Sequence, residues 1–559
     1  MTFTAQWLIP VVAVLSMNDA ANDVLKSLAY GSDAPGCSAA YAVGGQIAWS
    51  GVVGTADVEH AVAIRSDTPF DAGSISKSVT ALAVLLLERD GRLSLDDPVT
   101  KYVTGLPATY EPVRIRHLLS HSSGVRDWQD LLLIMGPFRR DDELRGSDVL
   151  AVLRSQRGLN FRPGTRVQYS NSNYVLLGEV VRAASGLSLA NFARTRIFEP
   201  LGMRHSRIVD DHTAIIRGVA IGHQKNDTGW EVVPRVWDLV GPSDLYATAA
   251  DLALFLDAIR IPEWHALFTR MEAIATLDGG APAADDTGRF AGLGFWIRKH
   301  DGMTVVGHSG ETHGTRAAVY QIREKDQTVA VLCNHNQIDP ETAAMRLLDA
   351  FTDAGWTKSL DTMPPDQRSG PPRPEERRFA GTYQQPDSRI PYRISATENG
   401  LAFGMSRRPL LPLADGSYTL ADVPGFRVLF RESGESTHMF LLNGGARDLE
   451  PYDRVSTDWQ YTPAPADIGA IAGCYVSPEL GVAVQLRGEE NGSMDLIDPR
   501  GRVRKFDAAL RDLWRGGFDT LELDREAKGE VKGFTRSTEI AWRVQYVRRP
   551  CSGAPPGAP

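Results

Sequence analysis

The stretch FDAGSISKSVTALAVLLLERDG, Phe70–Gly91, places a Ser-x-x-Lys directly before a long apolar run. Because this run is apolar on every side, it predicts a helix that is buried on all faces. Ser74 stands at the expected start of the helix, and Lys77 projects from the same side one turn later. Ser74 is therefore a candidate for a helix cap, for a nucleophile, or for both.

The pairing of Ser74 with Lys77 offers a route to nucleophilic catalysis. A serine at a helix N-terminus lies at the positive end of the helix dipole, and its own N–H makes no intrahelical bond. A lysine held in a partly buried site can lose its proton near neutral pH and then take one from the serine. Four-residue patterns with two fixed positions also arise by chance. Motifs elsewhere in the chain therefore decide whether this Ser-x-x-Lys is functional.

Two later segments carry such motifs. Residues 169–171, Tyr-Ser-Asn, lie in a predicted loop before a helix that ends at Gly186, a typical C-cap residue. Residues 308–310, His-Ser-Gly, close a predicted strand. Two flanking stretches accompany them, LLSHSSG at residues 118–124 and PLGM at residues 200–203.

In this order, the three motifs resemble the signature elements of the serine β-lactamase and penicillin-binding protein superfamily. The flanking stretches are similar to its class C-like and esterase-like branch, and the resemblance covers residues 20–357. With the C-terminal region described below, the chain is most similar to the D-aminopeptidase type. Peptidases of linearised cyclic peptides are near relatives. The resemblance implies an α+β catalytic domain, with an antiparallel sheet and a helical subdomain, followed by two lipocalin-like β-barrels.

The resemblance also implies roles for single residues. Ser74 is the expected acylated nucleophile, and Lys77 and Tyr169 form the expected general base system. The sequence leaves open which of these two groups is the base. Asn171 is the residue expected to bind the amide carbonyl of the substrate.

The third motif departs from the commoner Lys-Thr-Gly of this superfamily. His308 is mostly neutral at pH 7, so it offers no permanent cation to a substrate carboxylate. Gly310 and Glu311 follow it, and the N–H of Glu311 is expected to complete an oxyanion hole with the N–H of Ser74. We therefore expect aminopeptidase, amidase or esterase chemistry rather than carboxypeptidase or β-lactamase action.

Further residues are candidates for substrate recognition. In the D-aminopeptidase type, a loop of the last barrel reaches the active site and meets the free amine of the substrate. By this resemblance, Asp512 and Trp514 in the stretch at residues 506–519 are the expected anion and aromatic wall. Trp128 and Trp237 are candidate pocket walls, with packing in the core as the alternative for each.

The catalytic domain shows strand patterns at both ends. A hairpin is predicted around Gly44-Gly45, and three β-rich runs follow Gly292. Helical patterns fill the region between them, so a sheet built from both ends of the domain is expected, with a helical insertion packed against it.

A proline-rich linker at residues 358–376 separates this domain from an internal repeat. The segments that begin at Phe379 and Ile471 share Ala-Gly-x-Tyr, and each repeat unit closes on Tyr-x-Arg. Two β-barrels at residues 377–457 and 466–551 are predicted, followed by a tail at 552–559. The barrels are interpreted as lids that narrow the site, with homodimerisation or ligand-binding modules as the alternative.

The four cysteines show no spacing typical of metal ligands. Four inert thiols are one interpretation. In a closed barrel the first and last strands are neighbours, so Cys474 and Cys551 are expected to come close, as are Cys37 and Cys333 in the catalytic sheet. If the protein is exported, one or both pairs are expected to form disulfides.

Composition indicates a globular chain of 559 residues with a formal net charge of −9, which argues against a nucleic-acid partner. Residues 1–19 contain an apolar run that resembles a secretory signal, although no Lys or Arg precedes Lys26. The run is too short to span a membrane. Periplasmic or secreted localisation is favoured, with a cytoplasmic one as the alternative.

The function expected from the sequence is that of a serine hydrolase acting on small or linear peptides or amides, including those with D-residues. No metal or cofactor is expected. A carboxylesterase of the same family remains open, because esters and amides share the nucleophile and the oxyanion hole. A non-catalytic penicillin-binding-like ligand sensor is the alternative from a different class, and the intact Tyr-x-Asn motif argues against it.

Overall fold

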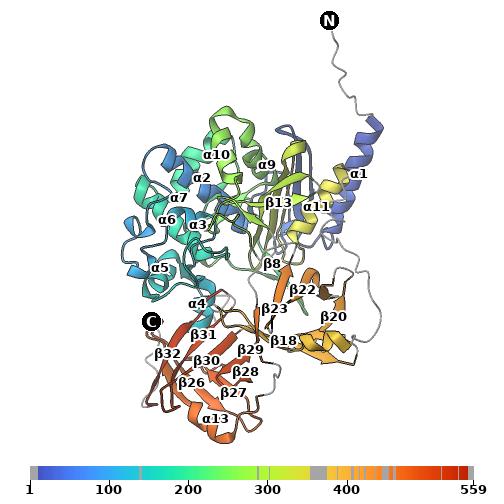
Figure 1. Cartoon of the computed structure of the whole chain (residues 1–559). Helices are drawn as coiled ribbons and strands as arrows, with labels where there is room; N and C mark the ends of the chain where they lie inside the picture. Colours follow the sequence, from blue (N-terminus) through green and yellow to red (C-terminus); the bar gives the residue numbers. More distant parts are fainter. Residues whose placement is uncertain are drawn as a thin grey trace.

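A computed structural model describes residues 11–551, apart from 137–141, 286–288, 301, 353–373, 387, 399, 405–407, 414–415, 421–422, 435, 444–451, 457–460, 518 and 539. A region of helices around one large sheet comes first, and two β-barrels follow it (Figure 1). The predicted fold class is confirmed.

The large sheet is antiparallel and joins strands from both ends of the catalytic region, as predicted. Its order is β12-β13-β14-β15-β16-β1-β2. The turn between β1 and β2 is made by Gly44 and Gly45, whose φ angles of +59° and +82° favour glycine. The strands are β1 (Cys37–Val43), β2 (Gln46–Val53), β12 (Phe290–Ala291), β13 (Trp296–His300), β14 (Met303–Glu311), β15 (Arg316–Ile322) and β16 (Gln327–Cys333).

Short strands outside this sheet connect the helical region to it. Three of them, β5, β11 and β7, form a small sheet beside the Ser-x-x-Lys turn. The short strands are β3 (Thr55–Asp57), β4 (Val62–Ala63), β5 (Phe70–Asp71), β6 (Leu144–Arg145), β7 (Arg207–Ile208), β8 (His223–Asn226), β9 (Gly229–Val232), β10 (Trp237–Asp238) and β11 (Leu245–Ala247).

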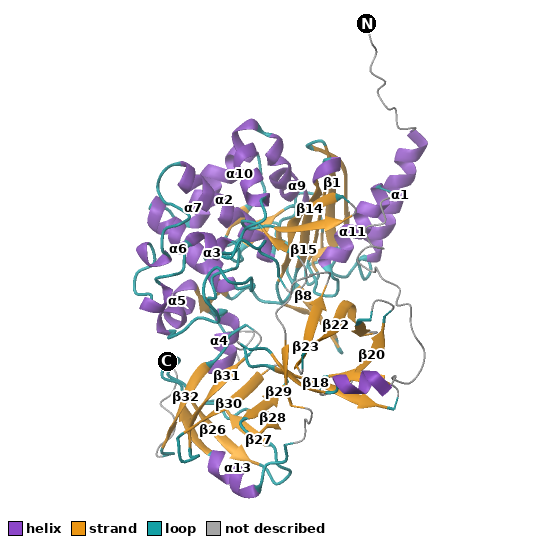
Figure 2. Cartoon of the chain, in the orientation of Figure 1, coloured by secondary structure: helices purple, strands orange, loops and turns teal. Residues whose placement is uncertain are grey.

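Helices cover both faces of the large sheet (Figure 2). On one face α1 (Val11–Ser27) and α11 (Pro340–Phe351) pack together, and Phe351 stacks on Tyr41 of β1 at 4.0 Å between ring centroids. On the other face α9 (Ala249–Asp257) contacts β1 and β16. The other helices are α2 (Ser76–Arg89), α3 (Ile115–Leu119), α4 (Trp128–Met135), α5 (Gly146–Ser155), α6 (Asn171–Ser185), α7 (Leu189–Ala193), α8 (Glu199–Leu201) and α10 (Pro262–Glu272).

Helix α2 is buried along nearly its whole length, as its apolar run predicts. Every residue from Ser76 to Leu87 is buried. The helix begins two residues later than expected, because Gly73–Ile75 forms a 3₁₀ turn before it. The expectation that Ser74 caps the helix is wrong, since no side chain makes a capping bond at either start. The Ser74 hydroxyl is thereby left for other partners.

The N-terminal segment and the linker are only partly described. Residues 11–19 of the predicted signal segment belong to α1, which continues to Ser27 and buries Ala21 and Leu25. Most of the predicted linker lies outside the described residues, and its end is a 3₁₀ helix, Pro374–Phe379. Among the described helices none alone is long and apolar enough to cross a membrane, although α6 with Leu189–Leu201 meets that test as a pair bent by 72°.

Both barrels are closed, because the first strand of each pairs with the last. Strands of the first barrel are β17 (Gly381–Gln384), β18 (Pro391–Thr397), β19 (Gly400–Phe403), β20 (Arg408–Pro412), β21 (Tyr418–Leu420), β22 (Val423–Ser433), β23 (Ser436–Asn443) and β24 (Tyr452–Ser456). After α13 (Pro465–Ile471), the second has β25 (Gly473–Val476), β26 (Ala483–Gly488), β27 (Met494–Ile497), β28 (Val503–Leu510), β29 (Leu513–Gly516), β30 (Asp519–Arg525), β31 (Val531–Ser537) and β32 (Val544–Arg549).

The internal repeat has a structural counterpart. Tyr383 and Tyr475 are both fully buried, and each hydroxyl donates to the carbonyl oxygen four residues earlier. Arg454 and Arg548 lie opposite these tyrosines on the closing strand and donate to carbonyl oxygens just before the first strand. The conserved geometry of these two pairs explains why the repeat keeps Ala-Gly-x-Tyr and Tyr-x-Arg.

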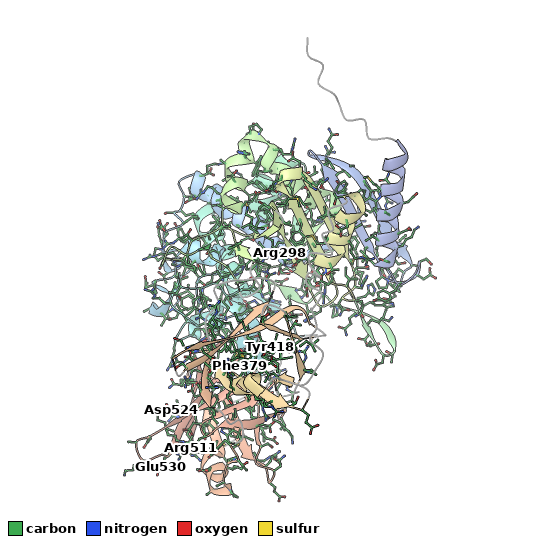
Figure 3. The ribbon with its side chains drawn as sticks, turned by 45° about the vertical axis from the view of Figure 1, so that its right-hand side comes forward. Arg298, Phe379, Tyr418, Arg511, Asp524 and Glu530 are labelled. Atoms are coloured by element: carbon green, nitrogen blue, oxygen red, sulfur yellow. A yellow bond between two sulfur atoms is a disulfide. The ribbon has the colours of Figure 1, made fainter. Side chains whose placement is uncertain are left out.

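Aromatic side chains fill the first barrel. Phe379 and Tyr418, both labelled in Figure 3, pack on Phe430 with ring centroids 4.6 and 5.7 Å apart. The barrel interior is therefore a packed core, in which apolar side chains from opposite strands meet.

All four cysteines are paired. Cys37 and Cys333 face each other across β1 and β16 and form one disulfide, and Cys474 and Cys551 form the other. The pairs are those expected for an exported protein, and the structure contains no free cysteine.

Candidate active site

The three sequence motifs meet at Ser74. Its Oγ lies 2.8 Å from the Lys77 Nζ and 2.9 Å from the Tyr169 hydroxyl. Lys77 reaches it from the first turn of α2, and Tyr169 from the loop just before α6. Contact between α2 and α6 in the core brings these distant segments together.

Burial sets the protonation of Lys77. The side chain is fully buried, and its Nζ also lies 3.1 Å from the carbonyl oxygen of Pro242. Desolvation lowers the pKa of Lys77 to about 7, although the nearby Asp127 acts in the opposite direction. A substantial fraction of Lys77 is therefore the neutral amine at pH 7.

Tyr169 has the opposite tendency. Burial raises the pKa of its phenol above the ordinary value, with a smaller lowering effect from the hydrogen bond to Ser74. The Lys77 Nζ lies 4.9 Å from the centroid of the Tyr169 ring. Tyr169 therefore stays a neutral phenol whose hydroxyl donates to the Ser74 Oγ.

The end of β14 lies directly against the turn that carries Ser74. A Cβ at Gly310 would lie 1.9 Å from the Ala72 carbonyl oxygen and 3.0 Å from the Ser74 nitrogen. A Cβ at Gly73, whose φ is +52°, would lie 2.8 Å from the Glu311 nitrogen. Only glycine fits at these two positions, and the close approach brings the backbone N–H groups of Ser74 and Glu311 to one place.

His308 lies at this same strand end and is buried. Burial, followed by the charge of Lys77, lowers the pKa of His308 to about 3. Its ring centroid is 6.4 Å from that of Tyr169. The imidazole is neutral at pH 7, so it supplies no positive charge to the site.

Asn171 begins α6 beside the site and is held by the segment at residues 127–129. Its backbone N–H donates to the Asp127 carboxylate, and its Nδ2 donates to Gln129 Oε1 at 2.8 Å. Burial raises the pKa of Asp127 to about 6, while hydrogen bonds from Gln129 and Asn171 act in the opposite direction. Asp127 also caps α4 through its bond from the Gln129 N–H.

The second barrel contacts this same segment. The Ile540 carbonyl, in the loop between β31 and β32, accepts from the Asp127 N–H at 3.1 Å and from Asn160 Nδ2 at 3.0 Å. Asp130 accepts from the Ile540 N–H at 2.9 Å and from the Thr538 hydroxyl at 2.6 Å. The segment at residues 127–130 thus links the barrel to Asn171.

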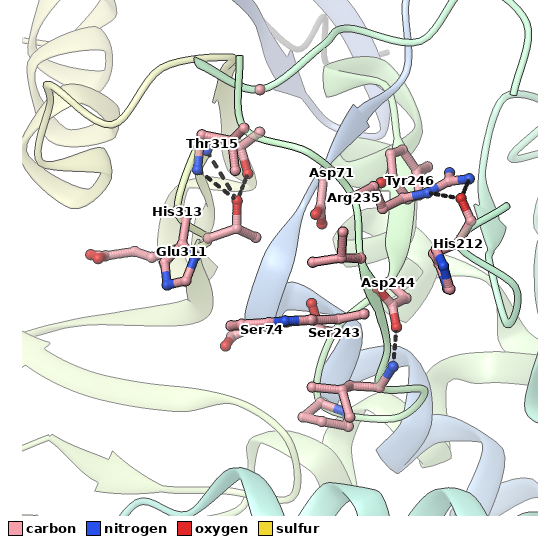
Figure 4. A pocket seen from close by; sticks show the side chains of 18 of the residues that line it. Asp71, Ser74, His212, Arg235, Ser243, Asp244, Tyr246, Glu311, His313 and Thr315 are labelled. Atoms are coloured by element: carbon pink, nitrogen blue, oxygen red, sulfur yellow. Dashed lines mark hydrogen bonds between the residues drawn. The ribbon is translucent and has the colours of Figure 1, made fainter. Parts of the chain in front are cut away.

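Ser74 opens onto a cavity of about 800 Å³. Trp128 and Trp237 both line it, with an edge-to-face contact at 5.8 Å between ring centroids. Asn171, His308 and Glu311 also line it. Figure 4 shows Ser74 at one side of this cavity and a group of charged residues at another.

The expectation for Asp512 and Trp514 is wrong. Asp512 is absent from the cavity lining, and its carboxylate accepts from Arg525 Nε at 2.7 Å within the second barrel. Trp514 is 1% exposed and packs in the barrel core. The loop that approaches the active-site region is instead the one at residues 538–542, between β31 and β32.

Several lining residues carried no recognisable signal in the sequence. Arg289 lies over Trp296 at 4.5 Å from the ring centroid, and its guanidinium pairs with Asp285 at 2.8 Å. Asp71 and Asp244 also line the cavity. Asp71 lies three residues before Ser74, but nothing in its sequence context indicates that it faces a cavity.

Within the described residues, one cluster outside the disulfides has side chains grouped as metal ligands are: Asp211, His212 and Asp238, whose ligand atoms lie within 4.8 Å of one another. His212 and Asp238 already bond to each other at 3.0 Å. The cluster is partly exposed, and exposed acidic groups commonly gather without an ion.

Comparisons with known proteins agree with this geometry. A family model described as Beta-lactamase matches residues 21–354. A D-aminopeptidase of Cereibacter sphaeroides is 26% identical over 551 residues, which cover 95% of this chain and 98% of that protein.

Solved structures share the fold. The octameric penicillin-binding protein homologue from Pyrococcus abyssi has a TM-score of 0.54 at 22% identity, and the match covers 89% of this chain and 100% of that one. The D-amino acid amidase from Ochrobactrum anthropi SV3, complexed with L-phenylalanine amide, has a TM-score of 0.51 at 21% identity. That match covers 61% of this chain and 99% of the amidase.

Proposed function

Since the chain belongs to the Beta-lactamase family, we propose that it is a serine hydrolase whose acyl-enzyme forms on Ser74. The observation that carries this proposal is the position of the Ser74 Oγ, within 3 Å of both the Lys77 Nζ and the Tyr169 hydroxyl. A hydroxyl that only stabilised the fold would need neither a buried amine nor a buried phenol beside it.

The two groups divide the proton transfer. Lys77, as a neutral amine, accepts the Ser74 proton while the Oγ attacks the carbonyl carbon of the scissile amide. The N–H groups of Ser74 and Glu311 bind the negative charge on the carbonyl oxygen, a contribution of about 10²-fold or more per donor. As the C–N bond breaks, the leaving nitrogen receives the proton from the Lys77–Tyr169 pair.

Water completes the cycle. It attacks the ester carbonyl of the acyl-enzyme, and the same pair takes its proton and returns one to the Ser74 Oγ. The products are a carboxylic acid and an amine. Neither half-reaction in this scheme uses a metal ion or a cofactor.

The substrate class that we propose is a small peptide or amide, cleaved as by a D-aminopeptidase or a D-amino acid amidase. His308 is neutral, and Arg289 is already paired with Asp285, so neither of these two residues offers a free positive charge to a substrate carboxylate. A D-aminopeptidase that matches nearly the full length, both barrels included, supports the same class.

A panel of chromogenic substrates tests this assignment. The full chain is assayed with D- and L-alanyl p-nitroanilide, a D-alanyl peptide with a free C-terminus, and p-nitrophenyl acetate. We expect the D-alanyl anilide to be hydrolysed much faster than the acetate ester. We also expect the Ser74→Ala variant to lose this hydrolysis. Turnover of the ester alone would instead make the protein a carboxylesterase.

A further inference from the structure

The cavity at Ser74 contains a second polar region, formed by Asp71 of β5 and Asp244 just before β11 (Figure 4). One oxygen of Asp71 accepts from the Gly73 N–H at 2.9 Å, and one oxygen of Asp244 accepts from the Leu239 N–H at 2.6 Å. Within the described chain the other oxygen of each carboxylate has no hydrogen-bond partner. Asp244 is only 5% exposed and lines the cavity, so its side chain lies largely away from bulk solvent.

The charges around this pair do not cancel. Arg235 is the nearby cation, but its guanidinium donates to the carbonyl oxygens of His212 and Ala214 and makes no ion pair with either aspartate in the described structure. Asp238 is already bonded to His212. When both carboxylates are ionised, one guanidinium does not balance them, and the region then carries an excess of negative charge.

Burial acts on both carboxylates. It raises the pKa of Asp71 to about 6 and that of Asp244 well above its ordinary range, and Asp71 itself adds to the effect on Asp244. Hydrogen bonds from backbone N–H groups and the charge of Arg235 act in the opposite direction without balancing it. A cation bound near both carboxylates would favour the ionised form of each.

We propose that Asp71 and Asp244 bind an ammonium group on the acyl part of the substrate. This inference rests on the proposed function, in which the free amine belongs to the acyl part. An ammonium group offers three donors, and a carboxylate accepts them in short, charge-assisted bonds. The α-amine of an N-terminal residue and the ε-amine of a lysine side chain share this chemistry.

Kinetics with matched substrates separate these two sources. The p-nitroanilides of D-alanine, N-acetyl-D-alanine and N-acetyl-D-lysine carry an α-ammonium, no ammonium and a side-chain ammonium. We expect one of the two charged compounds to exceed the neutral one by about 10-fold or more in kcat/KM, the range of a charge-assisted hydrogen bond. Equal rates for all three would overturn the proposal.

Isosteric variants assign the preference to the two carboxylates. Asp71→Asn and Asp244→Asn each retain an oxygen for the existing backbone bond, and asparagine tolerates the φ of +68° at position 244. Each variant should lose most of the preference through KM, so that its kcat/KM for the charged substrate falls towards the value that the same variant shows with the neutral substrate. Asp67→Asn is the matched control, because Asp67 pairs with exposed Arg65. A preference that persists in both variants would contradict the proposal.

The pH dependence adds an independent readout. The groups that face the pair are Arg235, His212, Asp238 and Tyr246. Because ammonium binding requires ionised carboxylates, KM for the charged substrate should fall as pH rises from 5 to 7. KM for the neutral substrate should not follow this trend. Parallel profiles for both substrates would count against the two aspartates.

A binding experiment keeps this inference separate from the proposed function. Calorimetry on the Ser74→Ala protein compares two pairs of amides, D-alaninamide with D-lactamide and N-acetyl-D-lysinamide with N-acetyl-D-norleucinamide. The measurements are repeated on that protein carrying Asp244→Asn. Tighter binding of the amine in either pair, lost with the second change, supports the ammonium site even if no anilide is hydrolysed. Equal binding within both pairs by Ser74→Ala overturns it even if the enzyme is an active hydrolase.

Discussion

At the scale of single residues, the site depends on what burial does to two groups of opposite tendency. Lys77 loses much of its affinity for a proton, whereas Tyr169 holds its proton more tightly. When the environment shifts the pKa values of two neighbouring groups in opposite directions, one group can act as the base and the other as the acid. We therefore propose Lys77 as the base, which the sequence leaves open, and Tyr169 as the hydrogen-bond donor to Ser74.

The pH profile of the enzyme tests this assignment. Because the pKa of Lys77 is lowered to about 7, the amine is protonated and inactive below that pH. The value of kcat/KM for an uncharged amide should therefore drop about 10-fold per pH unit below 7 and level off above it. The measurement is a steady-state profile from pH 5 to 9.

Tyr169→Phe supplies the control for that profile. The variant should be slower by orders of magnitude, because it removes a donor to the Ser74 Oγ, but its inflection should stay near pH 7. If the inflection disappears together with the phenol, Tyr169 and not Lys77 is the titrating base.

At the scale of elements, a loop of the second barrel supports the segment at residues 127–130, which holds Asn171 beside the site. The bonds between Ile540, Asp127 and Asp130 tie the β31–β32 loop to the start of α4. Asp127 in turn accepts from the Asn171 N–H. We infer that this barrel positions the segment at residues 127–130, and through it Asn171, from outside the cavity. This differs from the expected arrangement, in which a loop of the barrel enters the site.

Asp130→Ala tests this positioning role. Asp130 accepts two hydrogen bonds from Thr538 and Ile540, so its loss should weaken the attachment of the β31–β32 loop to α4, leaving the bond from the Asp127 N–H. We expect KM for the amide to rise several-fold to about 10-fold, with a smaller change in kcat. Asp524→Ala in the same barrel, where Asp524 pairs with exposed Lys532, is the control. Identical kinetics in both variants would show that the loop has no such role.

The sequence predicts elements that depend on local residue patterns. It does not predict features that depend on which segments, distant in sequence, lie side by side in the fold. The Gly44-Gly45 hairpin, the buried α2 and the two repeated barrels follow from turn residues, hydrophobic periodicity and repetition. The site at Ser74 follows from motif order. Asp512 is misplaced because the sequence shows that a barrel has loops but not which loop faces the catalytic region. Asp71 and Asp244 meet only through the fold, so neither is recognisable alone.

At the scale of the whole molecule, the second barrel and the catalytic region share one apolar core. A buried ion pair crosses their interface: Arg126 Nη1 and Glu479 Oε2 are 2.8 Å apart, with side chains 5% and 3% exposed. Glu479 also accepts from the Arg157 and Gln545 N–H groups. The two parts are therefore expected to unfold together.

Glu479→Ala should be strongly destabilising. It leaves the Arg126 charge buried without its partner, which typically costs about 3–5 kcal/mol in the free energy of unfolding. Urea unfolding of the full chain measures this cost. The double variant Arg126→Met, Glu479→Leu should recover most of the loss, since replacing a buried pair with apolar groups costs little. A single variant as stable as the parent would mean that the interface is open in solution.

Two disulfides lead us to propose an oxidising compartment, periplasmic or extracellular, for this protein. Alkylation of protein taken from its native cells, without reductant, should then label no cysteine by mass spectrometry. Reduction before alkylation should label all four and serves as the control. Four labelled thiols without reduction would support a cytoplasmic location.

The central claim is that Ser74 becomes covalently acylated, and intact-mass analysis tests it most directly. The full chain is treated with a fluorophosphonate probe, in which the serine oxygen displaces fluoride, and then digested to locate the adduct. We expect one adduct on the peptide that contains Ser74, none on Ser74→Ala, and a loss of amide hydrolysis proportional to the labelling. An adduct on another residue, or a Ser74→Ala protein that still hydrolyses the amide, would show that Ser74 is not the nucleophile.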